Sequence, residues 1–92
     1  MLVNPILIYA FPVPSVDPYQ AVCARVAALL REERERRGWS MTALASRAGL
    51  SQQSVSYVER GMRIPNLDTL LRVCDALGVS LADILARACS PP

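Results

Sequence analysis

All four glycines of this 92-residue chain stand where a run of helical spacing ends, at Gly38, Gly49, Gly61 and Gly78. Before each of them apolar residues recur at steps of three and four, and glycine readily takes the left-handed conformation that closes a helix. Polar residues suited to N-caps open the later runs, at Ser40, Ser51, Asn66 and Ser80. These helix start and stop signals predict five helices and an all-α fold in which helices pack on helices.

The expected helices cover most of the chain after Pro18. They run from Tyr19 to Arg37, from Met41 to Ala48, from about Gln52 to Arg60, from Leu67 to Leu77, and from Leu81 toward a frayed C-terminal tail. The fourth is expected to bury a set of apolar side chains, namely Leu67, Leu70, Leu71, Val73, Cys74 and Leu77. The fifth has Leu81, Ile84 and Leu85 on its apolar side.

A chain of this length has room for one modest core and not for a second. About half of its residues are apolar and few are aromatic, so the core is expected to consist mainly of Leu, Val, Ile and Ala. We divide the sequence into an arm over residues 1–18, a helical domain over residues 19–89 and a tail over residues 90–92.

The arm is apolar and is interrupted by Pro5, Pro12 and Pro14, which disfavour both a helix and a central strand. It lacks the basic start of a signal peptide, and its run from Ile6 to Phe11 is far shorter than the ~20 residues of a membrane-spanning helix. We expect an extended or disordered segment. Its apolar run either strengthens a dimer, by pairing with its counterpart or lying over a partner's core, or belongs to a floppy tail.

The charge of the chain is a weak guide to its partners. The net charge is only +2, and all ten basic residues are arginines, a bias that a GC-rich coding genome also produces. The run from Arg31 to Arg37 mixes both signs. We expect it to form a solvated helix end with an i,i+4 pair between Glu32 and Arg36.

The chain also lacks the residues of most metal and catalytic sites. Its three cysteines are far apart and it contains no histidine, so a zinc site is not expected. Cys74 lies at a core-type helical position, and we expect a buried thiol in a reducing cytosol. No nucleophile stands beside a base and no glycine-rich loop could cradle a phosphate, so neither an enzyme nor a cofactor is expected.

The segment from Met41 to Arg60 has the spacing of a helix-turn-helix. That motif needs a small residue where its two helices approach, a turn residue that tolerates positive φ, and β-branched residues that anchor the second helix inward. Ala45, Gly49, Val55 and Val58 meet these needs, with steps of four, six and three. Three coincident requirements within one short segment are much more specific than any one of them.

The second helix of this motif has two contrasting faces. An advance of ~100° per residue places Ser54, Val55 and Val58 on the inner side. The outer side carries Gln52, Gln53, Ser56, Tyr57 and Arg60, almost all of which form hydrogen bonds. A glutamine amide matches adenine N6 and N7, while tyrosine can touch a thymine methyl group or a phosphate. This face is therefore able to read base edges.

From about Val26 to Leu85 the sequence resembles the phage-repressor helix-turn-helix family of the Cro/C1 or XRE type. The likeness is carried by SQQSVSYVERG and by RIPNLDTLLRVCDALGVSLADIL. The resemblance implies a five-helix, lambda-repressor-like domain. It also implies a transcriptional repressor or autoregulator that binds a palindromic operator in double-stranded DNA as a homodimer.

The expected DNA contacts divide into two classes. The base-contacting residues are Gln52, Gln53, Ser56 and Tyr57, at the end of the helix that enters the groove and along its outer face. The phosphate-contacting residues are Ser40, Thr42, Arg47, Ser51, Arg60 and Arg63. The family often has glutamine where this chain has Met41, so that backbone contact is not carried over. Glu59 is expected to be structural and to pair near the start of the following loop.

Other functions share the same helical domain. An antitoxin that represses its own operon, or a controller of restriction-modification genes, would have the same DNA-binding unit. A protein-interaction module that binds DNA weakly is a further alternative. The dimer surface is either the arm or the last helix through Leu81, Ile84 and Leu85. We expect a cytoplasmic, nucleoid-associated protein with no membrane contact and no small-molecule substrate.

Overall fold

The structure is a computed structural model that describes residues 18–61 and 65–90. These residues form five α-helices and no strand: α2 (Pro18–Arg36), α3 (Met41–Ala48), α4 (Gln52–Arg60), α5 (Leu67–Leu77) and α6 (Leu81–Cys89). The all-α, five-helix prediction is confirmed. The first helix begins and ends one residue earlier than predicted. The arm up to Asp17, the predicted phosphate contact Arg63 and residues 91–92 lie outside the described residues.

The predicted N-caps have the expected geometry. In each case the capping side chain accepts a hydrogen bond from the backbone N–H three residues later, which satisfies a donor that the helix itself leaves unpaired. The distances are 3.0 Å from Ala43 N to Ser40 Oγ, 3.1 Å from Ser54 N to Ser51 Oγ, 2.8 Å from Thr69 N to Asn66 Oδ1 and 3.3 Å from Asp83 N to Ser80 Oγ. These local bonds explain why the sequence located the helix starts.

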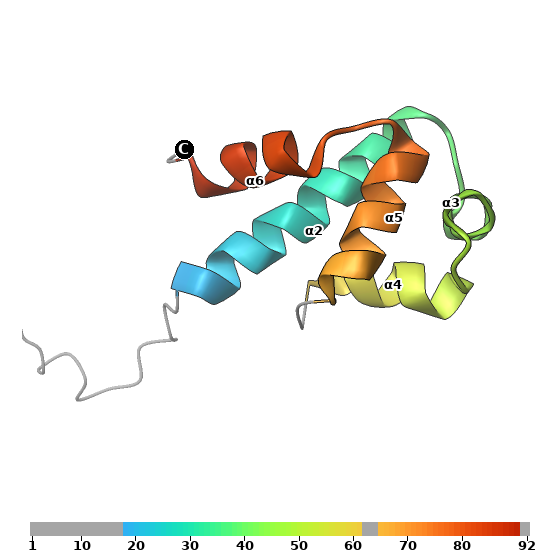
Figure 1. Cartoon of the computed structure of the whole chain (residues 1–92), viewed down its shortest axis with the longest axis horizontal. Coiled ribbons are helices and arrows are strands. Elements are labelled where there is room, and N and C mark those ends of the chain that lie inside the picture. Colours follow the sequence, from blue (N-terminus) through green and yellow to red (C-terminus); the bar gives the residue numbers. More distant parts are fainter. Residues whose placement is uncertain (1–17, 62–64, 91–92) are drawn as a thin grey trace, which may run out of the picture.

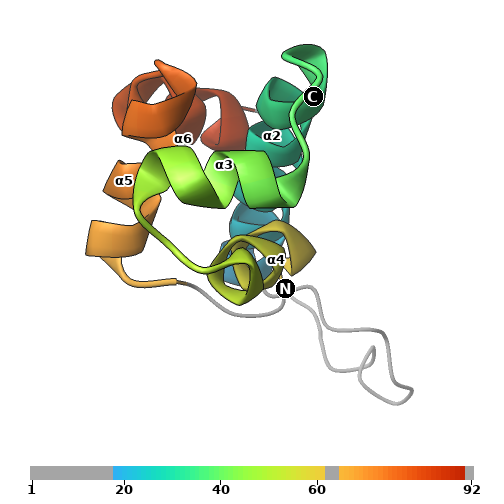
Figure 2. The same ribbon diagram turned by 90° about the vertical axis from the view of Figure 1, so that its right-hand side faces the viewer.

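The long helix α2 supports three of the other helices. It lies against α6, α4 and α5, while α3 packs on α4 and α5. Figure 1 shows α2 crossing the molecule between α6 and the other helices, and Figure 2 shows α3 facing outward with α4 below it. The fully buried side chains come from all five helices: Leu30, Leu44, Val55, Val73, Leu77 and Ile84.

The apolar face of α5 is wider than the surface that covers it. Val73, Cys74 and Leu77 are buried as predicted, but Leu67 is 61% exposed and Leu71 is 50% exposed. The prediction that these two leucines are buried is wrong, because α2 and α3 cover only the side of α5 that carries Val73, Cys74 and Leu77. Two leucines are thus left facing solvent on α5.

The sequence suggested that the charged run at the end of α2 is a solvated helix end, and this is only partly right: Arg31, Glu32, Glu35 and Arg36 are exposed, but two residues of the run are buried. Glu33 is 4% exposed and Arg34 is 8% exposed, because α6 and α4 pack over this part of α2. The predicted Glu32–Arg36 pair is replaced by an Arg36–Glu33 pair at 3.2 Å. Long-range packing selects which charges turn inward, and helical spacing alone does not show this.

Glu33 is the centre of a small ionic cluster. Arg37 Nη1 donates to Glu33 Oε1 at 2.8 Å, while Arg36 and Arg87 of α6 approach Oε2 at 3.2 and 3.6 Å. The hydrogen bond from Arg37, together with the positive charge of Arg36, lowers the pKa of Glu33 below its ordinary value of 4.5. Its ionised form therefore stabilises the folded state above that pH, and the contribution is lost as the pH falls through the lower folded pKa.

We accordingly expect Glu33→Gln to lower the free energy of unfolding at pH 7, and the difference from the unsubstituted protein to shrink as the solution is acidified. Urea unfolding at a series of pH values measures this. Glu32→Gln, on the exposed side of the same helix, is the matched control and should change stability little at any pH. A difference for Glu33→Gln that stays constant down to acid pH would contradict the ionic role.

Candidate nucleic-acid interface

The connection between α3 and α4 is a tight turn built on a left-handed glycine. Gly49 has φ 71° and ψ 34°, and Leu50 N donates to Ala45 O at 2.9 Å. A residue with a Cβ atom would be strained in this conformation. Ser51 then caps α4 directly, so that only three residues separate the two helices. The predicted helix-turn-helix is present.

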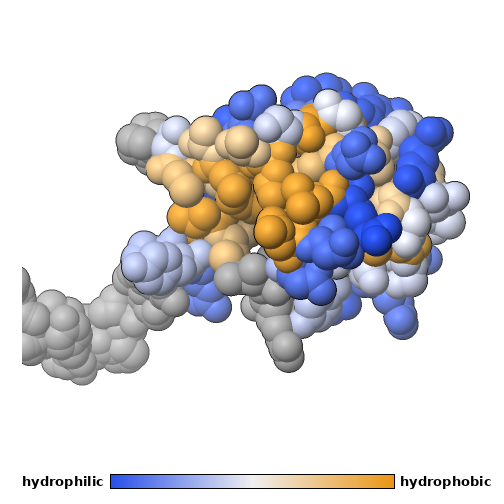
Figure 3. Space-filling view, viewed as in Figure 1, coloured by the Kyte–Doolittle hydropathy of each residue, from blue (hydrophilic) through white to orange (hydrophobic). Residues whose placement is uncertain are grey.

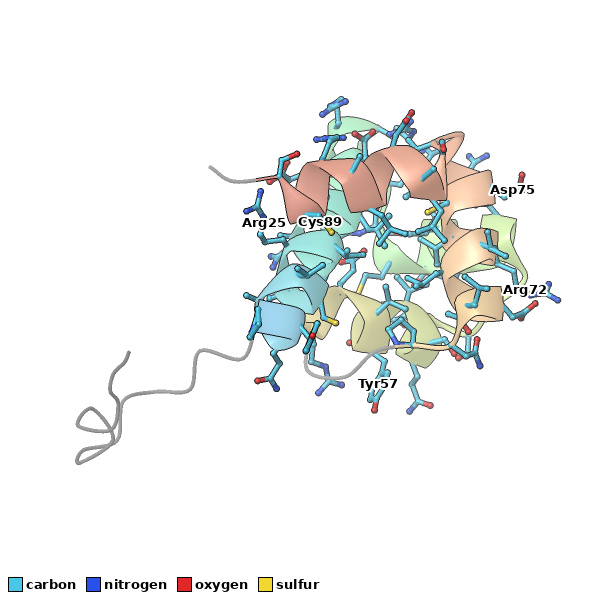
Figure 4. The ribbon with its side chains drawn as sticks, turned by 60° about the vertical axis from the view of Figure 1, so that its left-hand side comes forward. Arg25, Tyr57, Arg72, Asp75 and Cys89 are labelled. Carbon is cyan, nitrogen blue, oxygen red and sulfur yellow. The ribbon has the colours of Figure 1, made fainter. Side chains whose placement is uncertain are left out.

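Helix α4 buries one face and presents the other to solvent, as the sequence predicted. Val55 and Val58 are 1% and 3% exposed. The outer face carries Gln52, Gln53, Tyr57 and Arg60, which are exposed. Ser56 is less accessible, since it is half-buried. Figure 4 shows Tyr57 pointing outward from α4, away from the body of the molecule. The structure therefore brings three of the four predicted base-contacting side chains to one exposed surface and leaves Ser56 at its edge.

A buried ion pair fixes the far end of α4 to α2. Arg34 donates to both carboxylate oxygens of Glu59, at 2.7 Å from Nε and 3.0 Å from Nη2, and also to Trp39 O at 2.6 Å. The hydrogen bond with Glu59 raises the pKa of Arg34, so the guanidinium stays charged. The prediction that Glu59 pairs near the following loop is wrong, since its partner belongs to α2, 25 residues earlier.

This pair also determines the charge of the outer face. Glu59 is the only acidic residue of α4, and its side chain is 5% exposed. With its charge buried and neutralised by Arg34, the exposed side of α4 carries amides, a phenol and the cation of Arg60. Such a surface does not repel a polyanion.

At Gly61, the end of α4 lies very close to the backbone of α2. Gly61 has φ 66°, and a Cβ atom built on it would lie 3.1 Å from Ala27 Cβ and 3.3 Å from Ala24 Cα. Only glycine allows the end of α4 to come this near to α2 without displacement. The sequence predicted Gly61 as a helix stop but gave no sign of this contact, because it depends on the packing of α2 against α4.

The predicted phosphate-contacting residues lie in different settings. The side chains of Ser40 and Ser51 serve as N-caps, and Thr42 is exposed on the first turn of α3. The guanidinium carbon of Arg47 lies 4.2 Å from the centroid of the Trp39 ring, a cation–π stack that restricts an otherwise exposed side chain. Among the described residues Arg60 has no ion-pair partner. Arg63 lies outside the described part of the chain.

A hollow with both polar and apolar lining lies between α4 and the start of α5. It encloses about 790 Å³, including the solvent at its mouth, and its lining residues are Ser51, Gln53, Ser54, Tyr57, Val58, Pro65, Asn66 and Thr69. The capped N-termini of α4 and α5 thus open onto one surface. Sequence reading had placed Asn66 only as a cap and had not singled out Thr69, because the convergence of the two helix ends depends on the fold.

Comparison with known proteins identifies the family. Residues 30–84 match the HTH_3 family, which is described as helix-turn-helix. The chain belongs to this helix-turn-helix family. The match begins in α2 and ends in α6, so it includes the whole α3–α4 motif. The predicted resemblance to Cro/C1-type (XRE) regulators is confirmed.

Relatives in this family are named as transcriptional regulators. An uncharacterized HTH-type transcriptional regulator of Mycobacterium tuberculosis is 42% identical over 59 residues, which are 64% of this chain and 42% of that protein. Another from Sinorhizobium fredii is 36% identical over 77 residues, which are 84% of this chain and 95% of that protein. The chain thus spans less than half the length of the first relative and nearly all of the second.

A solved structure supports the same assignment. The crystal structure of the clp gene regulator ClgR from Corynebacterium glutamicum is similar with a TM-score of 0.66 and 34% sequence identity, over 73% of this chain and 86% of that one. The fold of this chain is therefore shared with a protein that is named as a gene regulator.

No helix in residues 18–61 and 65–90 is both long enough and apolar enough to cross a bilayer. No group of three or more His, Cys, Asp or Glu side chains in the same residues is placed to hold a metal ion.

Proposed function

We propose that this helix-turn-helix protein is a sequence-specific DNA-binding transcriptional regulator that reads the major groove with the outer face of α4. The observation that carries the proposal is the exposed, hydrogen-bonding and acid-free surface of α4, held in place by the buried Arg34–Glu59 pair. An α-helix fits the major groove of B-DNA, and side chains near its N-terminus reach the base edges first.

Base reading is assigned to the N-terminal half of α4. Gln52 and Gln53 are both exposed in its first turn, where each amide can match adenine N6 and N7. Tyr57 lies one turn further along the exposed face, in position for a thymine methyl group. Ser56, being half-buried, is proposed to contact a base only at the margin of the groove.

Backbone contacts are assigned to the residues that surround this face. Arg60 extends the exposed surface at the end of α4, and Arg47 is held by its stack on Trp39. Ser40, Thr42 and Ser51 stand at helix starts, where free N–H groups and the helix dipole favour a phosphate.

The hollow beside α5 adds Asn66 and Thr69 to the proposed backbone contacts. Arg63 stays a proposed phosphate contact on the family resemblance alone.

We further propose that two copies bind a palindromic operator and repress transcription by occupying it. Two copies of α4 would then enter successive major grooves about 34 Å apart. On α6 the predicted dimer residue Ile84 is fully buried in its own protomer, so it is removed from the dimer surface. Leu85, 40% exposed, and half-buried Leu81 are what α6 retains of the predicted set.

Salt-dependent binding to duplex DNA tests the backbone contacts. We expect Arg60→Ala to weaken binding to all sequences alike and to lower the slope of log K against log salt by about 1, because one phosphate contact fewer releases one counterion fewer. Arg31→Ala removes an exposed arginine that pairs with Glu35 on α2 and is the matched control. A changed base preference in the Arg60 variant, or an equal effect of the control, would contradict the assignment.

A further inference from the structure

Trp39 is the only tryptophan of the chain and lies in the connection between α2 and α3. Its side chain is partly exposed and packs against the core cluster. Figure 3 shows that hydrophobic surface gathers over α2, α5 and α6, whereas hydrophilic residues are more frequent at the end of the molecule that carries α3. An aromatic ring in such surroundings can hold a polar or charged group on its open face.

Two arginines approach this ring. The guanidinium carbon of Arg47 lies 4.2 Å from the ring centroid and that of Arg37 lies 5.9 Å from it, both within the ~6 Å range of cation–π attraction. Arg37 is also bound to Glu33, because its Nη1 donates to the backbone oxygen at 2.6 Å and to Oε1 at 2.8 Å. Arg47 has the stack and, among residues 18–61 and 65–90, no ion-pair partner. Its charge is therefore available to an external anion.

The stack carries the charge of Arg47 toward the start of α3. Arg47 belongs to the last turn of this helix, whereas Trp39 directly precedes the N-cap Ser40. The helix has eight residues and is about 12 Å long, so the two side chains must extend along it to meet. The guanidinium therefore lies closer to the proposed phosphate contacts Ser40 and Thr42 than the place of Arg47 in the sequence suggests.

A stack of this kind leaves the hydrogen-bonding capacity of arginine intact. The ring covers the flat face of the guanidinium, while the N–H groups point outward from its edge. A phosphate can accept two of these N–H groups in parallel, which is a strong and directional arrangement. Restricting the side chain beforehand also reduces the conformational entropy that it loses on binding.

The backbone of Trp39 is itself fixed relative to α4. Its N–H donates to the backbone oxygen of Arg34 at 3.2 Å, and its carbonyl oxygen accepts from Arg34 Nη1 at 2.6 Å. The same guanidinium binds both carboxylate oxygens of Glu59 on α4. One buried arginine thus connects the ring that holds Arg47 to the helix that is proposed to read bases.

We propose that Trp39 is a positioning residue, which holds the guanidinium of Arg47 where it contacts a phosphate of the DNA backbone. Trp39 acts through Arg47 and need not touch the DNA itself. This inference rests on the proposed function. It adds a residue that neither the helix-turn-helix spacing nor the expected set of DNA contacts contains.

A double-mutant cycle tests the proposal, with a pool of random-sequence duplexes as the probe, since phosphate contacts do not depend on sequence. Trp39→Leu removes the ring but keeps an apolar side chain, and we expect it to weaken binding about two- to fivefold. Arg47→Ala should weaken binding further and lower the slope of log K against log salt by about 1. In the Arg47→Ala background, Trp39→Leu should have no additional effect. Trp39→Tyr keeps a ring face and should bind nearly as tightly as the unsubstituted protein.

Fluorescence gives a second readout that leaves the tryptophan in place, because all tryptophan emission comes from Trp39. Without DNA, Arg47→Ala should uncover the ring and increase quenching of this emission by acrylamide. Arg31→Ala, which removes an arginine paired with Glu35, is the matched control and should leave the quenching unchanged. Circular dichroism establishes that each variant is folded.

The outcomes separate this inference from the proposed function. Equal weakening by Trp39→Leu with and without Arg47 would show a merely structural role and overturn the inference. So would unchanged quenching in Arg47→Ala, or a Trp39→Tyr variant that binds as weakly as Trp39→Leu. Absence of salt-dependent binding by the unsubstituted protein would instead overturn the proposed function, and this inference with it.

Discussion

Glu59→Ala is expected to lower the free energy of unfolding by about 3–5 kcal/mol, because it leaves the guanidinium of Arg34 buried without its counterion. Both side chains are nearly inaccessible, at 10% and 5% exposure, and their two hydrogen bonds are 2.7 and 3.0 Å long. A small domain has about 5–15 kcal/mol of stability in total, so this single change removes a large part of it. Urea unfolding followed by circular dichroism measures the loss.

Two further variants show whether the loss comes from the unpaired charge. The double variant Arg34→Met with Glu59→Leu removes both charges, and we expect it to recover most of the lost stability. Asp68→Ala breaks the exposed Arg72–Asp68 pair, whose side chains are 52% and 68% exposed, and should cost less than about 1 kcal/mol. A Glu59→Ala variant no less stable than Asp68→Ala would contradict a buried, structurally required pair.

Leu44→Ala is expected to cost about 2–5 kcal/mol, the range for deleting a large apolar side chain from a packed core. Leu44 of α3 is fully buried and packs in the cluster formed by all five helices. Leu71→Ala is the matched control from α5, where the leucine is 50% exposed, and it should change stability by no more than about 0.5 kcal/mol. Urea unfolding measures the loss of stability in each variant. Equal losses for Leu44→Ala and Leu71→Ala would contradict the difference in burial between the two leucines.

The helices could be predicted closely because their ends depend on local chemistry. A cap such as Ser51 binds a backbone N–H three residues away, and Gly49 takes a conformation that few other residues tolerate. Both signals are complete within a few residues of sequence. The alternation that placed Val55 inward and Gln53 outward is equally local, since it depends only on helical periodicity.

The errors arose where distant segments decide the environment. Glu33 and Arg34 are buried because α6 and α4 pack over them, and their partners Arg87 and Glu59 are far away in the sequence. Leu71 is exposed because periodicity identifies an apolar face but does not show how much of it neighbouring helices cover.

The candidate site shows the same division. The sequence located the helix that carries Gln52, Gln53 and Tyr57, and each of these side chains is exposed. It did not show that burial of Glu59 leaves their surface free of negative charge. Nor did it bring Thr69 into the hollow beside α4, because that requires the packing of α5.

Selection of binding sites from random duplex DNA tests the central proposal most directly. The protein should enrich a palindromic sequence, and Gln52→Ala with Gln53→Ala should relax base preference at one or two positions of each half-site, at about 1–3 kcal/mol per base contact. Its unfolding transition should be unchanged, since both glutamines are exposed. Enrichment of the same sequence with the same stringency by the double variant would contradict base reading by α4.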